Sequence, residues 1–353
     1  MYLIIFYEYN KKLEYLLAFK LDLNVNLLYT SYMKRKNNLY KNICYIENIM
    51  QTYKEIIRKT KNKKKKAQLN AYKSIYINRV YRTLNDKSYI IGEYNQFKIY
   101  EPKERIIYSQ KIEDKIINQL VAKYILYPSL LPCFIDANVA ARKRLGLKKG
   151  LILSNTFHHK CKINFQKYYI LKCDISKFFL SIDHNILKQK ILKRIKDKDA
   201  LEIVFDIIDS NHKGLYIGSM TSQILATFYL NDMDHFIKEK LKIKYYVRFQ
   251  DDFLLFHPSK KYLQYCLKEI SQFLKIEKLT LNKKTRIYKN TNNFVFLGRN
   301  NHGDYAKYRT VRRRLKFRKY KYTNSHIKLY NYTLSILSYK NLCKKNFKFK
   351  NGT

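Results

Sequence analysis

The chain has 353 residues, enough to bury a large core, and 46% of them are hydrophobic, which excludes an intrinsically disordered chain. Lys and Arg total 72 against 27 Asp and Glu, a net charge of +45, and this favours a polyanionic partner such as nucleic acid, although an AT-rich coding bias explains part of the excess lysine. The six cysteines show no CxxC or CxH spacing, which argues against a zinc ribbon or a disulfide framework and fits a reducing cytosol.

The first part of the chain predicts helices and one hairpin. Residues 1–40 are interpreted as an N-terminal extension of unknown role, and its opening apolar run is too short to span a bilayer. Apolar residues between Ile46 and Ile57 recur with helical spacing, and the basic run Arg58–Lys66 predicts a solvated loop or, alternatively, a template contact. A β-hairpin is predicted over Phe97–Ser109 and a helix over Asp114–Tyr127. Because no stretch is apolar enough to cross a membrane, we expect a cytoplasmic protein with no membrane partner.

From Tyr168 onwards, short apolar runs end in acids or enclose them. YYILKCD and KYYVRFQDDFLLF predict buried strands with carboxylates at their ends. Helical patterns lie at about His184–Ile208, Thr221–Leu241 and Tyr262–Leu274. This order predicts an α+β fold in which helices pack on one face of an antiparallel sheet. No acidic residue follows Asp304, and the segment from 309 to 321 interleaves basic with aromatic residues.

Three aspartates stand where the predicted strands end. Asp251 and Asp252 lie at the tip of a predicted hairpin, and Asp174 ends the preceding strand. Adjacent carboxylates in apolar surroundings resist ionisation unless cations neutralise them, and hard oxygen ligands suit Mg²⁺. The pair alone would also fit an ordinary exposed turn. Three carboxylates on neighbouring strands could instead hold two metals about 4 Å apart, which would activate a 3′-hydroxyl and stabilise the leaving pyrophosphate.

Five motifs in order resemble those of reverse transcriptases. DISKFF resembles motif A and FQDD motif C, while GLYIGSMTSQILATFYLNDMDHF, LTLNKKTRIY and FVFLGR resemble motifs B, D and E. The resemblance covers about residues 40–340 and implies an RNA-directed DNA polymerase with a right-hand fold. It implies N-terminal helices and fingers at 41–165, a palm at 166–300 whose antiparallel sheet is backed by helices, and a basic thumb at 301–353. The implied partners are an RNA template, a DNA or RNA primer and dNTPs, with two Mg²⁺ ions, or Mn²⁺ as a substitute.

The resemblance also assigns roles to single residues. Phe179 falls at the position of the steric gate that excludes ribonucleotides, and either Phe178 or Phe179 is expected to be a core residue. Lys284 aligns with a candidate general acid for pyrophosphate, or is a surface lysine. The other implied positions are Asp174, Ile175, Asp251 and Asp252 for the metals, Lys103 and Arg105 for the triphosphate, Ile217, Gly218 and Gln223 for the substrate, and Arg312, Arg313, Arg314 and Arg318 for template–primer phosphates.

Motif B departs from the usual pattern. Most reverse transcriptases carry Gln-Gly and Ser-Pro where this chain has Ile217-Gly218 and Ser222-Gln223. The departure resembles the polymerases of bacterial and phage diversity-generating retroelements, which implies low fidelity and a small basic accessory protein. Of the eight glycines, Gly214 and Gly218 fall in this one loop, where the backbone is expected to approach a ligand closely.

Other classes of protein remain open. A defence-associated, abortive-infection-like reverse transcriptase shares parts of the motif B pattern. A non-enzymatic basic RNA-binding protein would explain the charge but not the three strand-end carboxylates. An RNA-templated RNA polymerase would typically show Gly-Asp-Asp, a group II intron protein would be longer, and a retron enzyme would usually read YADD.

Overall fold

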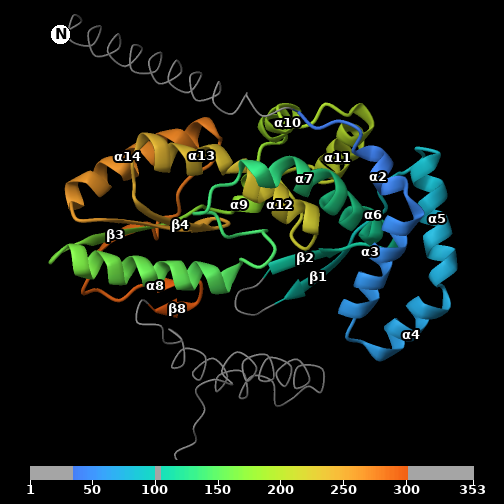
Figure 1. The fold of residues 1–353 in the computed structure, drawn as a ribbon, viewed down its shortest axis with the longest axis horizontal. Coiled ribbons are helices and arrows are strands. Elements are labelled where there is room, and N and C mark those ends of the chain that lie inside the picture. Colours follow the sequence, from blue (N-terminus) through green and yellow to red (C-terminus); the bar gives the residue numbers. More distant parts are fainter. Residues whose placement is uncertain (1–34, 100–104, 301–353) are drawn as a thin grey trace, which may run out of the picture.

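Helices form the first part of the computed structural model, which describes residues 35–99 and 105–300 (Figure 1). Before the first strand lie α2 (Tyr40–Cys44), α3 (Ile46–Lys59), α4 (Lys63–Ala71) and α5 (Lys73–Asn85). α3 confirms the helix predicted from the apolar spacing, and it buries Ile49, Tyr53 and Ile56 on one face. Most of the predicted N-terminal extension and all of the predicted thumb lie outside the described residues.

The basic run Arg58–Lys66 is mostly helical, so the loop predicted there is wrong except at residues 60–62. Asn62 begins α4, because its side chain accepts a hydrogen bond from Lys65 N at 3.0 Å and satisfies a main-chain donor of the first turn. The lysines at 63–66 are therefore exposed on a helical turn.

The predicted hairpin is confirmed. β1 (Asn95–Ile99) and β2 (Arg105–Ser109) pair antiparallel, with Asn95 opposite Ser109 and Ile99 opposite Arg105. The chain continues through α6 (Ile112–Leu120), the π-helical turn η1 (Val121–Leu126), α7 (Tyr127–Leu130) and the 3₁₀ turn η2 (Leu131–Cys133). The helix predicted over Asp114–Tyr127 corresponds to α6 and η1.

An antiparallel sheet carries the segments in which the acidic strand ends were predicted. Within the described residues it has four strands in the order β4 (Tyr245–Phe249), β5 (Asp252–His257), β3 (Tyr169–Asp174) and β6 (Arg286–Lys289). Both strands predicted around the acids are present, and β4 and β5 form the predicted hairpin. β3 and β5 pair from Tyr169 opposite His257 to Asp174 opposite Asp252.

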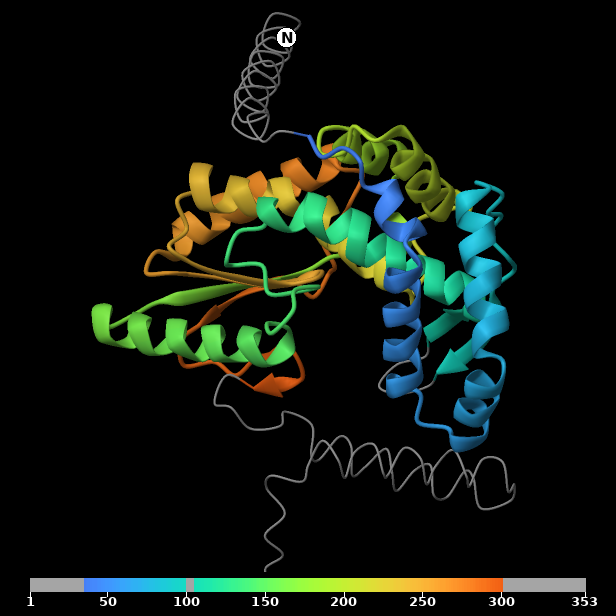
Figure 2. The same ribbon diagram turned by 45° about the vertical axis from the view of Figure 1, so that its right-hand side comes forward.

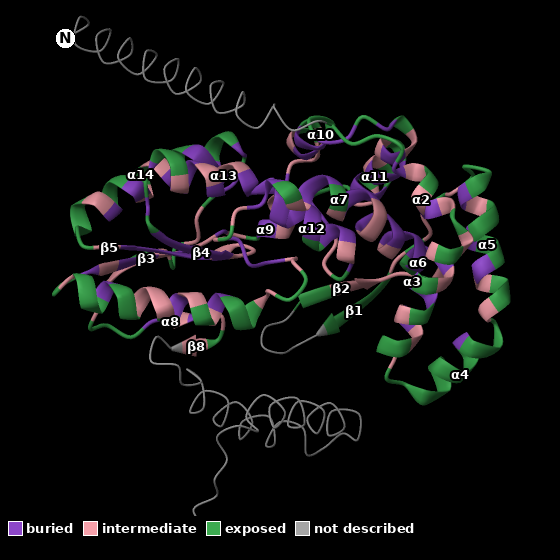
Figure 3. Ribbon diagram, viewed as in Figure 1, coloured by how far each residue is buried: buried purple, intermediate pink, exposed green. Residues whose placement is uncertain are grey.

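Both faces of the sheet are buried, whereas helices were predicted on one face only. Leu171 and Leu255 join the large core beneath α12–α14, while Ile170 and Leu254 join a second core on the opposite face. Figures 1 and 2 show α8 (Leu147–Asn164) beneath the sheet and α14 (Lys260–Ile276) above it. α8 was not predicted because the residues it buries are small, namely Gly150, Ser154 and Cys161, and Figure 3 shows only scattered burial along it.

The remaining helices surround the sheet. They are α9 (Phe178–Ser181), α10 (His184–Leu192), α11 (Lys198–Asp209), α12 (Met220–Tyr229), α13 (Asn231–His235) and the π-helical turn η3 (Phe236–Lys240). The single helix predicted at His184–Ile208 is two helices, α10 and α11. Asp197 caps α11 through Ala200 N, and its other oxygen accepts hydrogen bonds from Leu39 N and Tyr40 N, so the break ties α11 to α2.

The other two predicted helices are present. Thr221–Leu241 corresponds to α12, α13 and η3, and Tyr262–Leu274 to α14. β7 (Val295–Phe296) and β8 (Arg299–Asn300) form a short hairpin at motif E. None of the helices in the described ranges is long and apolar enough to cross a membrane.

Candidate active site

The three predicted catalytic carboxylates come together at one edge of the sheet. Asp174 ends β3, and Asp252 begins β5 directly opposite it. Asp251 lies in the turn that joins β4 to β5. Asp174 O accepts a hydrogen bond from Asn282 N at 2.7 Å, which fixes the strand end to the motif D loop.

Burial and mutual repulsion shift the acidities of two of these carboxyls. The pKa of Asp252 is raised to about 6, chiefly by burial and in addition by Asp174 and Asp251, while the Lys172 ammonium opposes the shift. Lys172 Nζ lies 2.7 Å from Asp252 Oδ1. Burial and Asp174 also raise the pKa of Asp251, and Arg105 lowers it. The site therefore favours bound positive charge.

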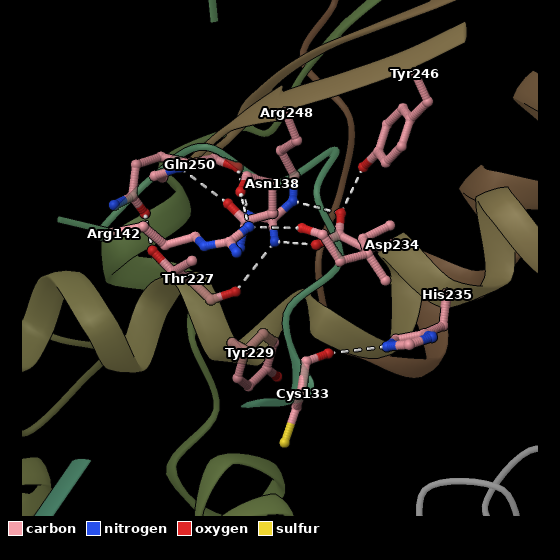
Figure 4. Close-up of polar contacts among 12 residues, drawn as sticks. Cys133, Asn138, Arg142, Thr227, Tyr229, Asp234, His235, Tyr246, Arg248 and Gln250 are labelled. Atoms are coloured by element: carbon pink, nitrogen blue, oxygen red, sulfur yellow. Dashed lines mark hydrogen bonds and ion pairs between the residues drawn. The ribbon is translucent and has the colours of Figure 1, made fainter. Parts of the chain in front are cut away.

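A buried ion pair supports the turn that carries Asp251, and sequence reasoning missed it. Arg248 and Asp234 are both fully buried, and Arg248 Nε donates to Asp234 Oδ1 at 2.6 Å (Figure 4). Arg248 Nη2 also contacts Asp234 Oδ2 and donates to Thr227 O. Arg248 Nη1 donates to Gln250 O at 3.0 Å, so the pair reaches the residue before Asp251, one of the three predicted catalytic carboxylates.

Further hydrogen bonds surround the Arg248–Asp234 pair and hold both residues in place. Tyr246 Oη donates to Asp234 Oδ1 at 2.6 Å, and burial beside Asp234 raises the pKa of Tyr246, so the phenol keeps its proton. On the main chain, Arg248 N donates to Ala137 O, and Val139 N donates to Arg248 O. The available signal in the sequence was an arginine inside the otherwise apolar run YYVRF, since a buried charge requires a partner.

The motif B glycines permit close packing of their backbone against other segments of the chain. A Cβ on Gly214 (φ +69°) would lie 2.2 Å from Phe179 O. A Cβ on Gly218 (φ +133°) would lie 2.8 Å from Tyr108 O. Leu215 N donates to Phe179 O at 2.7 Å, so the loop also fixes the backbone of the predicted gate.

The predicted substrate residues that the structure describes border this region. Phe178 is buried and Phe179 half-buried, with ring centroids 5.7 Å apart, so one of the two rings is a core residue as expected. Gln223 is exposed although its neighbours in α12 are buried, and its main-chain oxygen accepts a hydrogen bond from Gln250 Nε2 at 3.5 Å. Ile217 is half-buried, and its main-chain oxygen accepts a hydrogen bond from Tyr108 N.

Three other predicted residues, Lys284, Ile175 and Arg105, also lie in the described part of the chain. Lys284 is exposed, and its main-chain N donates to Asn282 Oδ1 at 3.1 Å in the loop that also holds Asp174. Ile175 is buried in the core beneath α14. Arg105 is exposed at the start of β2. The remaining predicted residues lie outside the described part of the chain, namely Lys103, Arg312, Arg313, Arg314 and Arg318.

The oxygen ligands at the sheet edge suit Mg²⁺ in their chemistry. In the described ranges, however, no group of three or more His, Cys, Asp or Glu side chains is gathered closely enough to hold a metal ion as it stands. The raised pKa values of Asp251 and Asp252 indicate carboxylates that lack sufficient neutralising charge. Lys172 supplies part of that charge to Asp252.

An antiparallel sheet backed by helices, with acids at the ends of adjacent strands, defines the α+β palm of a right-hand polymerase. The family profile described as "Reverse transcriptase (RNA-dependent DNA polymerase)" matches residues 98–300. The chain belongs to this family.

Individual relatives are distant. The chain is 29% identical over 96 residues to the "Putative COX1/OXI3 intron 2 protein" of Saccharomyces cerevisiae, a match covering 24% of this chain and 11% of that protein. It is similar to telomerase from Candida albicans in complex with a telomeric RNA fragment (TM-score 0.48, 14% identity, 76% of this chain and 58% of that one). Telomerase from Candida tropicalis in the corresponding complex gives a TM-score of 0.47 at 14% identity, over 80% of this chain and 58% of that one. The chain thus spans little more than half of these structures and a small part of the intron protein.

Proposed function

We propose that this protein is an RNA-directed DNA polymerase that extends a DNA or RNA primer on an RNA template by two-metal nucleotidyl transfer. The observation that carries the proposal is the direct opposition of Asp174 and Asp252 across the β3–β5 ladder, with Asp251 in the adjoining turn. Family membership supports the reaction class. A basic RNA-binding protein without catalysis would not need carboxylates placed in this way.

The proposed metal ligands are Asp174, Asp251 and Asp252, together with Ile175. Because the side chain of Ile175 is buried in the core beneath α14, only its main-chain carbonyl is available as a ligand. Two bound Mg²⁺ ions, or Mn²⁺ ions, would supply the charge that activates the primer hydroxyl and stabilises pyrophosphate. Lys172 Nζ contacts one oxygen of Asp252, so it limits the repulsion between the carboxylates.

The proposed nucleotide contacts surround these carboxylates. Arg105 is close enough to Asp251 to lower its pKa, a placement that suits a triphosphate lying between the hairpin and the carboxylates. Lys103 would share that contact. The ring of Phe179 would press on the sugar, and Lys284 would protonate the leaving pyrophosphate. Gly218 and Gln223 border the site on the motif B side.

The wider architecture is proposed on the same basis. We assign fingers to 41–165, palm to 166–300 and thumb to 301–353, with Arg312, Arg313, Arg314 and Arg318 on the phosphates of the template–primer duplex. The net charge of +45 suits such a polyanionic partner. A cytoplasmic location fits the scattered cysteines.

Charge removal at the carboxylates tests the proposed function. Asp174→Asn and Asp251→Asn should each abolish DNA synthesis on a primed RNA template, because an amide is a poor ligand for Mg²⁺. Asp136→Asn is the matched control, since Asp136 is an exposed aspartate whose ion pair with Arg142 is 3.6 Å long. Thermal melting checks that all three variants fold. Near-full synthesis by either catalytic variant would overturn the proposal.

A finer proposal concerns fidelity. We propose that Ile217 loosens base selection, as in diversity-generating polymerases of bacteria and phage that work with a small basic accessory protein, because isoleucine packs but cannot hydrogen-bond. Misincorporation should concentrate opposite template adenine, and Ile217→Gln should reduce it, by about tenfold for each 1.4 kcal/mol of discrimination regained. The Tyr108 N to Ile217 O hydrogen bond is a main-chain contact and does not depend on this side chain. Sequencing of cDNA from both proteins on one RNA measures the difference, and equal, low error rates would favour a defence-type enzyme.

A further inference from the structure

Most of the described side chains of the β1–β2 hairpin are exposed. The described side chains of β1, from Asn95 to Lys98, are all exposed, and Phe97 is 48% exposed. In β2, Arg105 and Ile106 are exposed as well. A two-stranded hairpin is at best marginally stable by itself in water. Contacts at the other end of β2 therefore help to set the position of Arg105.

Those contacts are made by three tyrosines, Tyr94, Tyr108 and Tyr216, which we call the tyrosine cluster. The ring centroid of Tyr216 lies 4.4 Å from that of Tyr94 and 4.1 Å from that of Tyr108. Tyr94 and Tyr108 meet edge-to-face at 6.4 Å. Tyr216 belongs to the motif B loop, whereas the other two flank or belong to the hairpin, so the cluster joins the two segments.

Main-chain contacts reinforce the same junction. Tyr108 N donates to Ile217 O at 3.1 Å, directly beside the cluster. Gly218 packs so closely that a Cβ there would lie 2.8 Å from Tyr108 O and 3.2 Å from Ile107 Cγ2.

The hydroxyl of Tyr94 extends the junction to α11. It lies 3.2 Å from Ser210 Oγ at the end of that helix, and it accepts a hydrogen bond from Gln110 Nε2 at 3.4 Å. The tyrosine cluster is thus also attached to the C-terminal end of α11.

We propose that the tyrosine cluster is a positioning device that holds β2 against the motif B loop and thereby sets where Arg105 stands relative to Asp251. Arg105 is three residues before Tyr108 on the same strand. This inference rests on the proposed polymerase function for its catalytic consequence, namely tighter binding of the incoming nucleotide. Its structural half, the attachment of β2 to motif B, stands without any activity.

The test compares Tyr216→Ala with Tyr216→Phe in the full chain. Tyr216→Ala removes both ring contacts, and we expect the KM for dNTP in primer extension to rise about tenfold, with kcat and the Kd for template–primer changed little. Tyr216→Phe retains the ring and should behave as the parent protein does. Tyr81→Ala, which truncates an exposed tyrosine on α5, is the control for surface truncation.

Hydrogen–deuterium exchange of the Tyr108 amide separates the inference from the proposed function. In Tyr216→Ala this amide should exchange about tenfold faster than in the parent protein, whether or not either protein polymerises. Unchanged exchange, or an unchanged KM in an active enzyme, would overturn the inference. A parent protein without polymerase activity would instead refute the proposed function. If Tyr216→Ala does not fold, Gly218→Ala displaces Tyr108 by steric contact and should give the same faster exchange.

Discussion

Replacement of Arg248 by methionine should destabilise the protein strongly. Arg248 is fully buried, and it donates to both oxygens of Asp234 and to the main-chain oxygens of Thr227 and Gln250. Methionine has a similar length but no donor, so among the described residues Asp234 would keep only the Tyr246 hydroxyl as a hydrogen-bond partner. Removal of one partner from a buried ion pair typically destabilises a protein by about 3–5 kcal/mol.

A double variant separates stability from the geometry of the catalytic turn. Arg248→Met combined with Asp234→Asn has no unpaired buried charge, and the amide oxygen can still accept from Tyr246 Oη. We expect it to recover roughly half or more of the lost free energy of unfolding. Gln250 O would still lack its donor, and Gln250 holds a left-handed conformation with φ +57°. DNA synthesis should therefore remain low although the fold is restored.

Urea unfolding followed by circular dichroism measures the free energies, and primer extension on RNA measures the activity. Arg248→Lys is the matched control, because it keeps the charge but loses the planar fork that reaches both Asp234 and Gln250. The reasoning fails if the single variant loses less than about 1 kcal/mol. It also fails if the double variant is fully active, because Arg248 would then only balance the charge of Asp234.

Further predictions concern Phe179, the carboxyl of Asp252 and bound metal. Phe179→Ala should admit ribonucleotides far more readily, because only the ring collides with a 2′-hydroxyl; an unchanged deoxy-to-ribo preference in primer extension would make Phe179 a packing residue. The folded-state pKa of Asp252, about 6, lies above its ordinary value, so the stability this group contributes is present below about pH 4 and lost as the pH rises through 6. Without metal, Asp252→Asn should thus become more stable relative to the parent between pH 4 and 7. Mg²⁺ should stabilise the parent at pH 7 and not the variant, and chelation should abolish polymerisation. If the difference in melting temperature between the parent and Asp252→Asn does not change with pH, the predicted contribution of Asp252 is contradicted.

Features with a regular apolar pattern could be predicted from the sequence. α3 and α14 each place large apolar residues on one face, and β3 and β5 are short apolar runs next to acids, so both kinds of element follow from local sequence. Because each of these runs lies next to an acid, the sequence also predicted that Asp174 and Asp252 lie close together at the ends of neighbouring strands. The hairpin was predictable because its polar turn separates two apolar runs.

Features that depend on tertiary partners could not be predicted from the sequence. α8 buries small residues, so its covering of the second face of the sheet leaves no apolar stripe to recognise. The break between α10 and α11 depends on Asp197 accepting hydrogen bonds from Leu39 N and Tyr40 N, more than 150 residues earlier in the chain. The Arg248–Asp234 pair joins two motifs that the sequence shows only separately.

Burial on both faces of the sheet has a consequence for how reliably the catalytic acids are aligned. The pairing that sets Asp174 opposite Asp252 also sends Leu171 to one core and Ile170 to the other. A slip of β3 by one residue would exchange every side chain between the two cores and would bring the Lys172 and Asp174 side chains against the apolar layer beneath α14. A one-residue slip would therefore mis-sort the interior as well as misalign the carboxylates, so the packing of the two cores opposes that misalignment.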